Sequence, residues 1–158
     1  MTGPHKRGEG EIMEVRAVWK KNYKVEVKAR QFRVPIDEAP EFHGEDTGMM
    51  PTELFICSLA SCYCLALVFI AGKKRIEVKD MIVNVKGKKD LKNFIFSSLI
   101  VEVESSLAPE TLEEIIPLAK RYCFVSNTVS KSCPIEYIHK NSGVRIQNPE
   151  GKKTTSDS

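Results

Sequence analysis

The sequence predicts an α+β domain in which antiparallel sheets are combined with two central helices. Runs of alternating apolar and polar residues, typical of half-buried strands, occur near the beginning and in the middle of the chain. One long segment is apolar on nearly every side, and a second has apolar residues at helical spacing. Strands come in runs with the helical segments between them, which disfavours a wound parallel sheet.

The first sheet is expected near the beginning of the chain. Residues 14–19 alternate, residues 20–22 form a polar turn, and residues 23–29 alternate again, which predicts a hairpin with one polar face. Residues 31–36 continue with apolar side chains on one side. Pro35 favours an edge position, because proline cannot donate a ladder hydrogen bond.

A loop and a buried helix are expected next. Residues 37–50 contain glycines and several acids, which predicts a loop. Pro51 is suited to the first turn of a helix, where its missing N–H is not needed. Residues 54–71 are apolar on nearly every side, so this helix has to be buried all round. Serines and cysteines interrupt the run, which favours a core helix over a membrane span.

A second hairpin and a second helix follow. Residues 78–86 and 94–104 alternate, with a lysine-rich turn between them. Apolar residues then recur at helical spacing from Pro109 onward, and Pro117 is expected to break or kink this helix. Two short terminal strands are expected at residues 134–139 and 144–146.

The organisation predicted is a disordered lead or tag at residues 1–12, a single domain at residues 13–147, and a polar tail at residues 148–158. The chain has 158 residues, 42% hydrophobic and 28% charged, which suits one soluble domain. A formal charge of +3, spread along the chain, disfavours nucleic-acid binding. The first residues lack an apolar signal segment, so we expect a cytoplasmic protein with no membrane partner.

Five cysteines in such a chain need an explanation. Their odd number disfavours a disulfide framework, and no C-x-x-C pair is present for zinc. Cys62 and Cys64 would point about 200° apart on a helix, so both could not bind one ion. Taken alone, the cysteines are either small core residues or a chemically active pair.

Two segments together carry a family resemblance. The segment PTELFICSLASC, residues 51–62, resembles the P-x-E-L…L-A-[AS]-C element of OsmC-like proteins. The segment CFVSNTV, residues 123–129, is similar to their second-cysteine element, C-P-V-S-x-x-L. The loop that begins at Asp37 resembles the stretch before the first cysteine helix. The resemblance covers residues 14–146 and implies the OsmC-like fold, assembled as an intertwined homodimer.

The resemblance also implies an activity, that of a hydroperoxide reductase of the OsmC/Ohr type. Cys62 would be the thiol that reacts with a small-molecule hydroperoxide, and Cys123 the thiol that resolves it. An external dithiol would then reduce the disulfide, with no cofactor and no metal. Arg30 is the arginine expected to activate Cys62, although it could equally be a surface residue of its strand. Arg33 and Arg16 are its substitutes.

The sequence departs from the family pattern at several places. Thr52 stands where the Ohr branch has a glutamate, and Glu53 would project about 180° from Cys62 on one helix, which favours a structural role. Phe124 replaces the usual proline after the second cysteine. Cys133 precedes a proline but lacks the V-S that follows in the motif, so it is interpreted as structural.

The walls around Cys62 are expected to be apolar, formed by Leu59, Tyr63, Ala66, Phe124 and Val125. Two other functions remain open at this point. One is a non-catalytic binding module on the same fold for an apolar or thioester ligand. The other is a purely structural dimer with unreactive cysteines.

Overall fold

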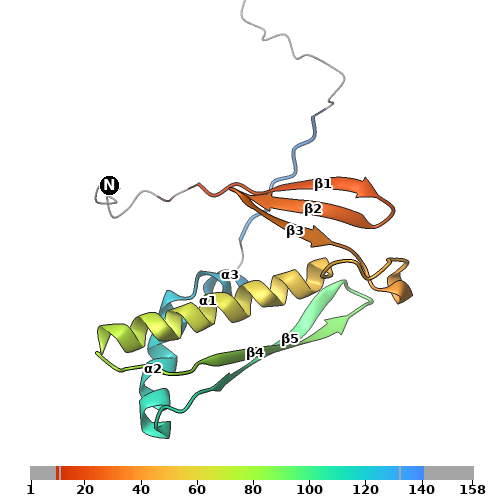
Figure 1. Ribbon diagram of the computed structural model, residues 1–158. Helices are drawn as coiled ribbons and strands as arrows, with labels where there is room; N and C mark the ends of the chain where they lie inside the picture. Colours follow the sequence, from red (N-terminus) through yellow and green to blue (C-terminus); the bar gives the residue numbers. More distant parts are fainter. Residues whose placement is uncertain (1–9, 11, 132, 141–158) are drawn as a thin grey trace, which may run out of the picture.

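The structure is a computed structural model in which residues 10, 12–131 and 133–140 are described. Helix α1 (Pro51–Lys73) lies between a three-stranded sheet on one side and a two-stranded hairpin on the other (Figure 1). Both sheets are antiparallel. The predicted α+β class with antiparallel sheets is therefore confirmed.

The three-stranded sheet contains β1 (Arg16–Lys21), β2 (Lys24–Ala29) and β3 (Phe32–Ile36), with β2 in the centre. Val27 of β2 lies opposite Val34 of β3, in the register that the alternating pattern requires. The strands lie close to the predicted positions, and β3 carries its proline at the edge of the sheet, as expected.

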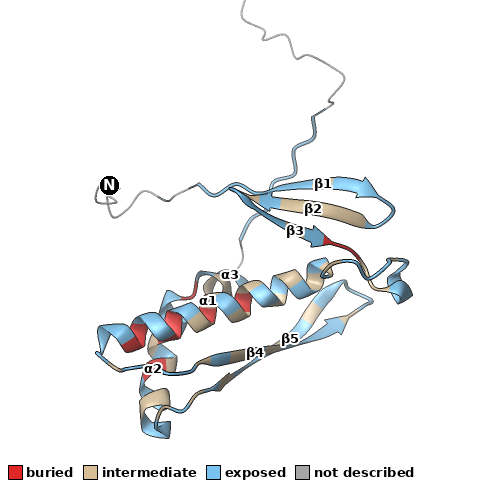
Figure 2. Ribbon diagram, viewed as in Figure 1, coloured by how far each residue is buried: buried red, intermediate tan, exposed pale blue. Residues whose placement is uncertain are grey.

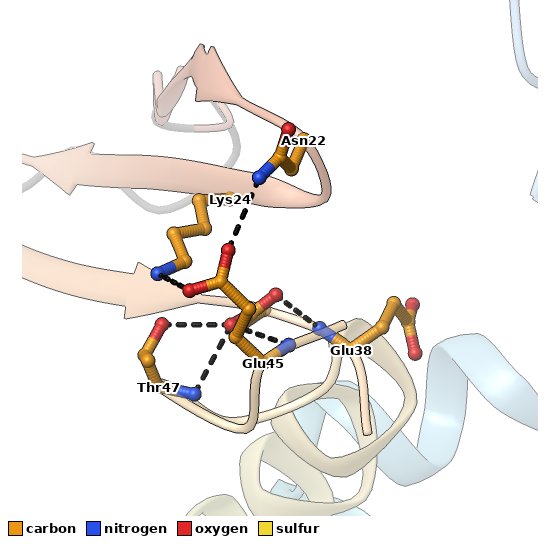
Figure 3. A network of polar contacts seen from close by, with 6 residues as sticks. Asn22, Lys24, Glu38, Glu45 and Thr47 are labelled. Carbon is orange, nitrogen blue, oxygen red and sulfur yellow. Dashed lines mark hydrogen bonds and ion pairs between the residues drawn. The ribbon is translucent and has the colours of Figure 1, made fainter. Parts of the chain in front are cut away.

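One buried carboxylate organises the loop between β3 and α1. Asp37 is 1% exposed, and its Oδ1 accepts the N–H of Glu38 at 2.9 Å. Its Oδ2 accepts the hydroxyl of Thr47 at 2.7 Å, the N–H of Thr47 at 3.1 Å and the N–H of Glu45 at 3.2 Å (Figure 3). Because these donors come from both ends of the loop, the carboxylate closes it.

The same loop is attached to the three-stranded sheet. The Glu45 carboxylate accepts hydrogen bonds from Lys24 at 2.6 Å and from Asn22 at 3.1 Å (Figure 3). Gly44 packs so closely on the backbone of Glu38 that a Cβ at this position would lie 1.7 Å from the Glu38 carbonyl oxygen. A glycine is therefore required at this turn.

Helix α1 begins where the sequence predicts. Pro51 is its first residue, and the Glu53 carboxylate accepts the N–H of Met50 at 2.9 Å, which satisfies one of the free donors at the helix start. Glu53 therefore has the structural role expected of it. One side of the helix is buried, through Leu59, Tyr63, Ala66, Leu67, Ile70 and Ala71.

The hairpin consists of β4 (Ile82–Asp90) and β5 (Ile95–Glu104). Strand β4 begins later than predicted, because the Asp80 carboxylate turns the chain there by accepting hydrogen bonds from the backbone and hydroxyl of Ser106. Gly87 lies within β4 and not in the turn. The buried residues of the main core lie on α1 and α2 (Pro109–Tyr122) and at Cys123 (Figure 2), and partly buried residues of the hairpin pack against them.

Two helices complete the described chain. Helix α2 runs through Pro117 without ending, so Pro117 does not break it, and the alternative of a kink stays a prediction. The Tyr63 hydroxyl donates to the carbonyl of Ile116, directly before this proline, at 3.1 Å. Helix α3 (Phe124–Val129) begins directly after the second cysteine.

The end of the chain differs from expectation. Residues 134–139 form no strand, so that prediction is wrong. The strand expected at residues 144–146 lies outside the described residues, as do the polar tail and nearly all of the lead at residues 1–12. The predicted single domain at residues 13–147 therefore stays a prediction.

The opposite side of α1 is not covered in one chain. Leu65 is 70% exposed, Phe69 47% and Val68 42%, while the three-stranded sheet shares no extensive contact with α1 among the described residues. By length and composition α1 is apolar enough to cross a membrane, with a mean hydropathy of 2.4 over its most apolar window. Core helices of soluble proteins share this property, and α1 packs against α2, α3 and β4.

We expect Asp37→Asn to lower the melting temperature by roughly 5 °C at neutral pH, because an amide group cannot accept all of these hydrogen bonds. The Thr47 hydroxyl and then the backbone N–H groups of Thr47, Glu38 and Glu45 lower the pKa of Asp37 from 3.8 to about 2. The stabilisation is therefore present above pH 3.8 and is lost as pH falls toward about 2.

Thermal unfolding followed by circular dichroism at several pH values measures this effect. Asp46→Asn is the control, since Asp46 lies exposed in the same loop and its side chain accepts no hydrogen bond within the described part of the chain. The difference between wild type and Asp37→Asn should shrink between about pH 5 and pH 2. A difference that stays constant over this range would show that the charge of Asp37 is not involved.

Candidate active site

Cys62 is half-buried on α1 and opens into a shallow pocket of about 250 Å³. Helix geometry explains three of the walls, because residues three, four and seven positions after Cys62 share its face. The fourth wall, Tyr122, comes from the end of α2. This thiol pocket is lined by Cys62, Leu65, Ala66, Phe69 and Tyr122.

The walls of the thiol pocket differ from those predicted. Ala66 lines it as expected, but Leu59 and Tyr63 point into the core instead. Phe124 is 84% exposed and does not line the pocket, and Val125 packs against the core. The apolar character of the walls was predicted correctly, although most of the residues were not.

Three wall residues were missed, and two of them had a signal in the sequence. Leu65 and Phe69 follow Cys62 by about one and two helical turns and could have been found from that spacing. Tyr122 depends on how α2 crosses α1, which no local pattern reveals. The rings of Phe69 and Tyr122 meet with centroids 5.4 Å apart.

Cys123 lies in the core next to this pocket. It is 0% exposed and separates α2 from α3 with a non-helical backbone, while its Sγ accepts the N–H of Ser126 at 3.4 Å. Cys62 packs against the same core cluster that contains Cys123. Cys123 also directly follows Tyr122, which lines the thiol pocket. Both predicted thiols therefore lie at the same core. Cys62 is open to solvent, and Cys123 is closed off from it.

Tyr63 fixes the geometry between the two cysteine-bearing elements. Its ring is buried, and its hydroxyl donates to the Ile116 carbonyl of α2. Burial raises the pKa of Tyr63, and the neighbouring Cys123 raises it further. The phenol therefore stays protonated at physiological pH and remains a donor that holds α2 against α1.

A lysine lies beside two aromatic walls of the thiol pocket. The Nζ atom of Lys73 lies 4.7 Å from the ring centroid of Phe69 and 5.5 Å from that of Tyr122. Such cation–π contacts keep the ammonium over the two rings. In the described part of the chain, no hydrogen bond reaches the Cys62 thiol.

Arg30 lies in a different part of the chain. It occupies the turn between β2 and β3 with a positive φ of 53°, and its guanidinium lies 5.0 Å from the ring centroid of Phe32. Arg33 pairs with Glu26 at 2.9 Å on the same sheet. Within one chain, the structure therefore brings Cys62 and Cys123 to a common core but leaves the predicted arginine on the three-stranded sheet.

The other cysteines have separate environments. Cys57 is exposed on α1, and Cys133 is exposed near the end of the described chain, outside any strand. Cys64 is half-buried, and its thiol donates to the Met81 carbonyl at 3.9 Å. Across the described residues, no group of three His, Cys, Asp or Glu side chains is placed to hold a metal ion.

Known structures share this fold. A hypothetical protein from Aquifex aeolicus VF5 is 27% identical, with a TM-score of 0.66 over 78% of this chain and 90% of that one. An OsmC-like protein from Mycoplasma pneumoniae is 20% identical, with a TM-score of 0.66 over 78% and 91% of the two chains. A putative organic hydroperoxide resistance protein from Vibrio cholerae, with captopril in one of its active sites, is 19% identical, with a TM-score of 0.66 over 82% and 92%.

Sequence comparison agrees with the structural match. A search of the curated proteins gave no significant relative. The family model of OsmC-like proteins matches residues 44–138, which include both predicted active cysteines. This match covers more than half of the chain, and the chain therefore belongs to the OsmC-like family.

Proposed function

We propose that this protein is a thiol-dependent peroxidase that reduces organic hydroperoxides. The observation that carries the proposal is the position of Cys62, whose side chain opens into an apolar pocket while packing on the core that contains Cys123. The fold is shared with proteins named for organic hydroperoxide resistance, which supports the choice of substrate class.

In the first step, the thiolate of Cys62 attacks the distal oxygen of the hydroperoxide. The O–O bond breaks, the alcohol leaves with a proton, and Cys62 becomes a sulfenic acid. The rings of Phe69 and Tyr122 would receive the alkyl part of the substrate. No cofactor or metal takes part in this step.

In the second step, the thiol of Cys123 attacks the sulfenic acid of Cys62. A disulfide forms and water is released, and an external dithiol then reduces the disulfide while becoming oxidised itself. The Sγ atom of Cys123 accepts the N–H of Ser126 at the start of α3, so the disulfide would form beside this helix start.

The proposal includes a homodimer in the cytoplasm, where dithiol reductants are available. The exposed apolar side of α1 would pack on a second copy of the chain, and the three-stranded sheet of one copy would approach the helix of the other. Arg30 would then act on Cys62 of the partner copy. This arrangement would give Arg30 its catalytic role through the partner copy.

A second function is favoured by the position of Arg30 on the three-stranded sheet. If no arginine reaches Cys62 in the assembled protein, the thiol pocket would serve as a binding site for an apolar or thioester ligand. Such a module would bind without turnover, so catalytic measurements separate the two functions.

Cys62→Ser should abolish turnover of cumene hydroperoxide with dithiothreitol, because the hydroxyl group is not a comparable nucleophile at neutral pH. Cys123→Ser should lose most of its steady-state turnover yet still form one sulfenic acid per chain. Mass spectrometry after trapping with dimedone measures that intermediate.

The remaining cysteines and arginines provide the controls. Cys57→Ser, Cys64→Ser and Cys133→Ser should retain most of the activity, since the structure places none of them in the thiol pocket. Arg30→Ala should lower kcat/KM at least about tenfold, and Arg33→Ala should not. Loss of turnover in Cys133→Ser with normal turnover in Cys123→Ser would identify a different resolving thiol.

Bulky organic hydroperoxides should have a higher kcat/KM than hydrogen peroxide. Each methylene buried against the apolar walls of the thiol pocket contributes about 0.8 kcal/mol, and hydrogen peroxide has no such group. Steady-state kinetics with cumene, tert-butyl and hydrogen peroxide under one dithiol test this order. Equal efficiency for all three would place the apolar walls away from the reacting thiol.

The protein should be a dimer at low micromolar concentration, and Val68→Glu should disrupt it, because a carboxylate would be placed in the apolar interface. Val68 is 42% exposed and does not line the thiol pocket. Multi-angle light scattering measures the mass. Val68→Ile is the matched control and should remain dimeric, whereas a monomeric, well-behaved wild type would contradict the proposed assembly.

A further inference from the structure

The two thiols of the proposed active site lie on different elements, so the packing of one element on the other sets their separation. Cys62 belongs to α1, and Cys123 lies at the junction of α2 and α3. A disulfide requires the two Cβ atoms to come within about 3.5–4.5 Å of each other. A shift of α2 along α1, or a rotation of either helix, would therefore take Cys123 out of reach of Cys62.

The buried side of α2 leads directly to Cys123. Ile115, Ala119 and Cys123 follow one another at intervals of four residues, and each is 0% exposed in the core cluster that they share with α1. Residues at this spacing lie on one side of a helix. The carbonyl of Ile116 lies about two helical turns before Cys123. A contact at Ile116 therefore restrains the helix end that carries the resolving thiol.

Tyr63 of α1 makes that contact. Its side chain is 8% exposed, and its hydroxyl donates to the Ile116 carbonyl at 3.1 Å. Among the described residues, one further side-chain hydrogen bond or ion pair joins these two helices, between Lys74 at the end of α1 and Glu114. That ion pair is exposed and screened by solvent, so it restrains α2 less than the buried hydrogen bond does.

The direction of the Tyr63 ring also distinguishes the two cysteines beside it in the sequence. Successive side chains on a helix differ by about 100°, so Cys62 and Cys64 lie on opposite sides of this ring. The thiol of Cys64 donates to the carbonyl of the residue before β4. Cys62 instead shares the thiol pocket with Tyr122, which directly precedes Cys123. The packing of Tyr63 on α2 therefore places Cys62 on the side of the resolving thiol.

We propose that Tyr63 is a positioning residue for the resolving step, in which its hydroxyl holds α2 so that Cys123 stays within reach of Cys62. The inference rests on the proposed function, which assigns the two thiols their roles. Tyr63 does not line the thiol pocket, so the attack of Cys62 on the hydroperoxide does not need its hydroxyl. The second step, in which the sulfur–sulfur bond forms and water leaves, depends on it.

Tyr63→Phe removes the hydroxyl and keeps the ring, so it separates the hydrogen bond from the packing. In single-turnover experiments with cumene hydroperoxide, the variant should form the Cys62 sulfenic acid at the wild-type rate. The Cys62–Cys123 disulfide should form roughly three- to tenfold more slowly, as expected from the loss of one hydrogen bond. Rapid acid quenching, dimedone trapping and peptide mass spectrometry measure the two rates.

Ile70→Val is the matched control for stability. Ile70 is 5% exposed on the buried side of α1, and it does not line the thiol pocket. Its shortening weakens the core by an amount comparable to the loss of one hydrogen bond, and it leaves the Tyr63 hydroxyl in place. Both steps should therefore keep their wild-type rates in Ile70→Val. The same is expected of Lys74→Met, which removes the exposed ion pair.

A thiol titration separates a failure of this inference from a failure of the proposed function. Equilibration of the full-length protein with reduced and oxidised glutathione forms the Cys62–Cys123 disulfide without any hydroperoxide. The effective concentration of the two thiols should be roughly three- to tenfold lower in Tyr63→Phe than in wild type. This difference is expected even if the wild type turns over no hydroperoxide, in which case only the proposed function fails.

Several results would overturn the proposal. Equal slowing of both steps in Tyr63→Phe would indicate a general loosening of the core and no specific role in resolution. The same slowing of disulfide formation in Ile70→Val would assign the effect to packing. Wild-type rates and a wild-type thiol equilibrium in Tyr63→Phe would show that the hydroxyl does not position Cys123. A wild type that forms no Cys62–Cys123 disulfide with glutathione would show that α2 does not hold the two thiols within reach.

Discussion

Helix α1 has more apolar surface than its own chain covers, and the rest of the structure depends on this constraint. The helix is apolar on nearly every side, yet α2, α3 and β4 pack on only one of them. The other side leaves Leu65, Val68 and Phe69 exposed. Exposed apolar surface costs about 25 cal/mol per Å² relative to burial, which favours a partner that covers this side of α1. The proposed second copy supplies the missing cover.

The boundary between the covered and uncovered sides of α1 decides which cysteine is open to a substrate. Cys62 lies on that boundary, so its side chain packs on the core and also opens into the thiol pocket. Cys64 is about 200° farther round the helix and points toward the hairpin, where its thiol donates to the Met81 carbonyl. Cys57 is exposed and does not line the thiol pocket. Spacing along one helix therefore distinguishes three chemically identical groups.

Sequence patterns over a few neighbouring residues predicted the strands and helices whose formation depends only on those residues. The alternation of apolar and polar residues was sufficient to predict the three-stranded sheet. The apolar run that follows Pro51 was sufficient to predict α1. The later start of β4 depends on Asp80 bonding to Ser106, and the continuity of α2 through Pro117 accompanies its packing on Tyr63 of α1. Both involve residues far apart in the sequence. The active-site prediction has the same limit, since helical spacing from Cys62 finds Phe69 but not Tyr122.

The position of Arg30 links the assembly of the protein to its chemistry. A peroxidatic thiol needs a cation that stabilises both its thiolate and the oxygen that leaves, and a planar guanidinium can bind two atoms at once. In one chain Arg30 stacks on Phe32 in the three-stranded sheet, and Lys73 is held over two rings beside the thiol pocket. An ammonium in that place can attract an anion but cannot form the paired hydrogen bonds of a guanidinium. In the assembly that we propose, the sheet of a second copy would bring Arg30 to α1 and provide them. The proposed peroxidase activity is therefore linked to the proposed dimer, whereas a monomer would favour the binding-module function.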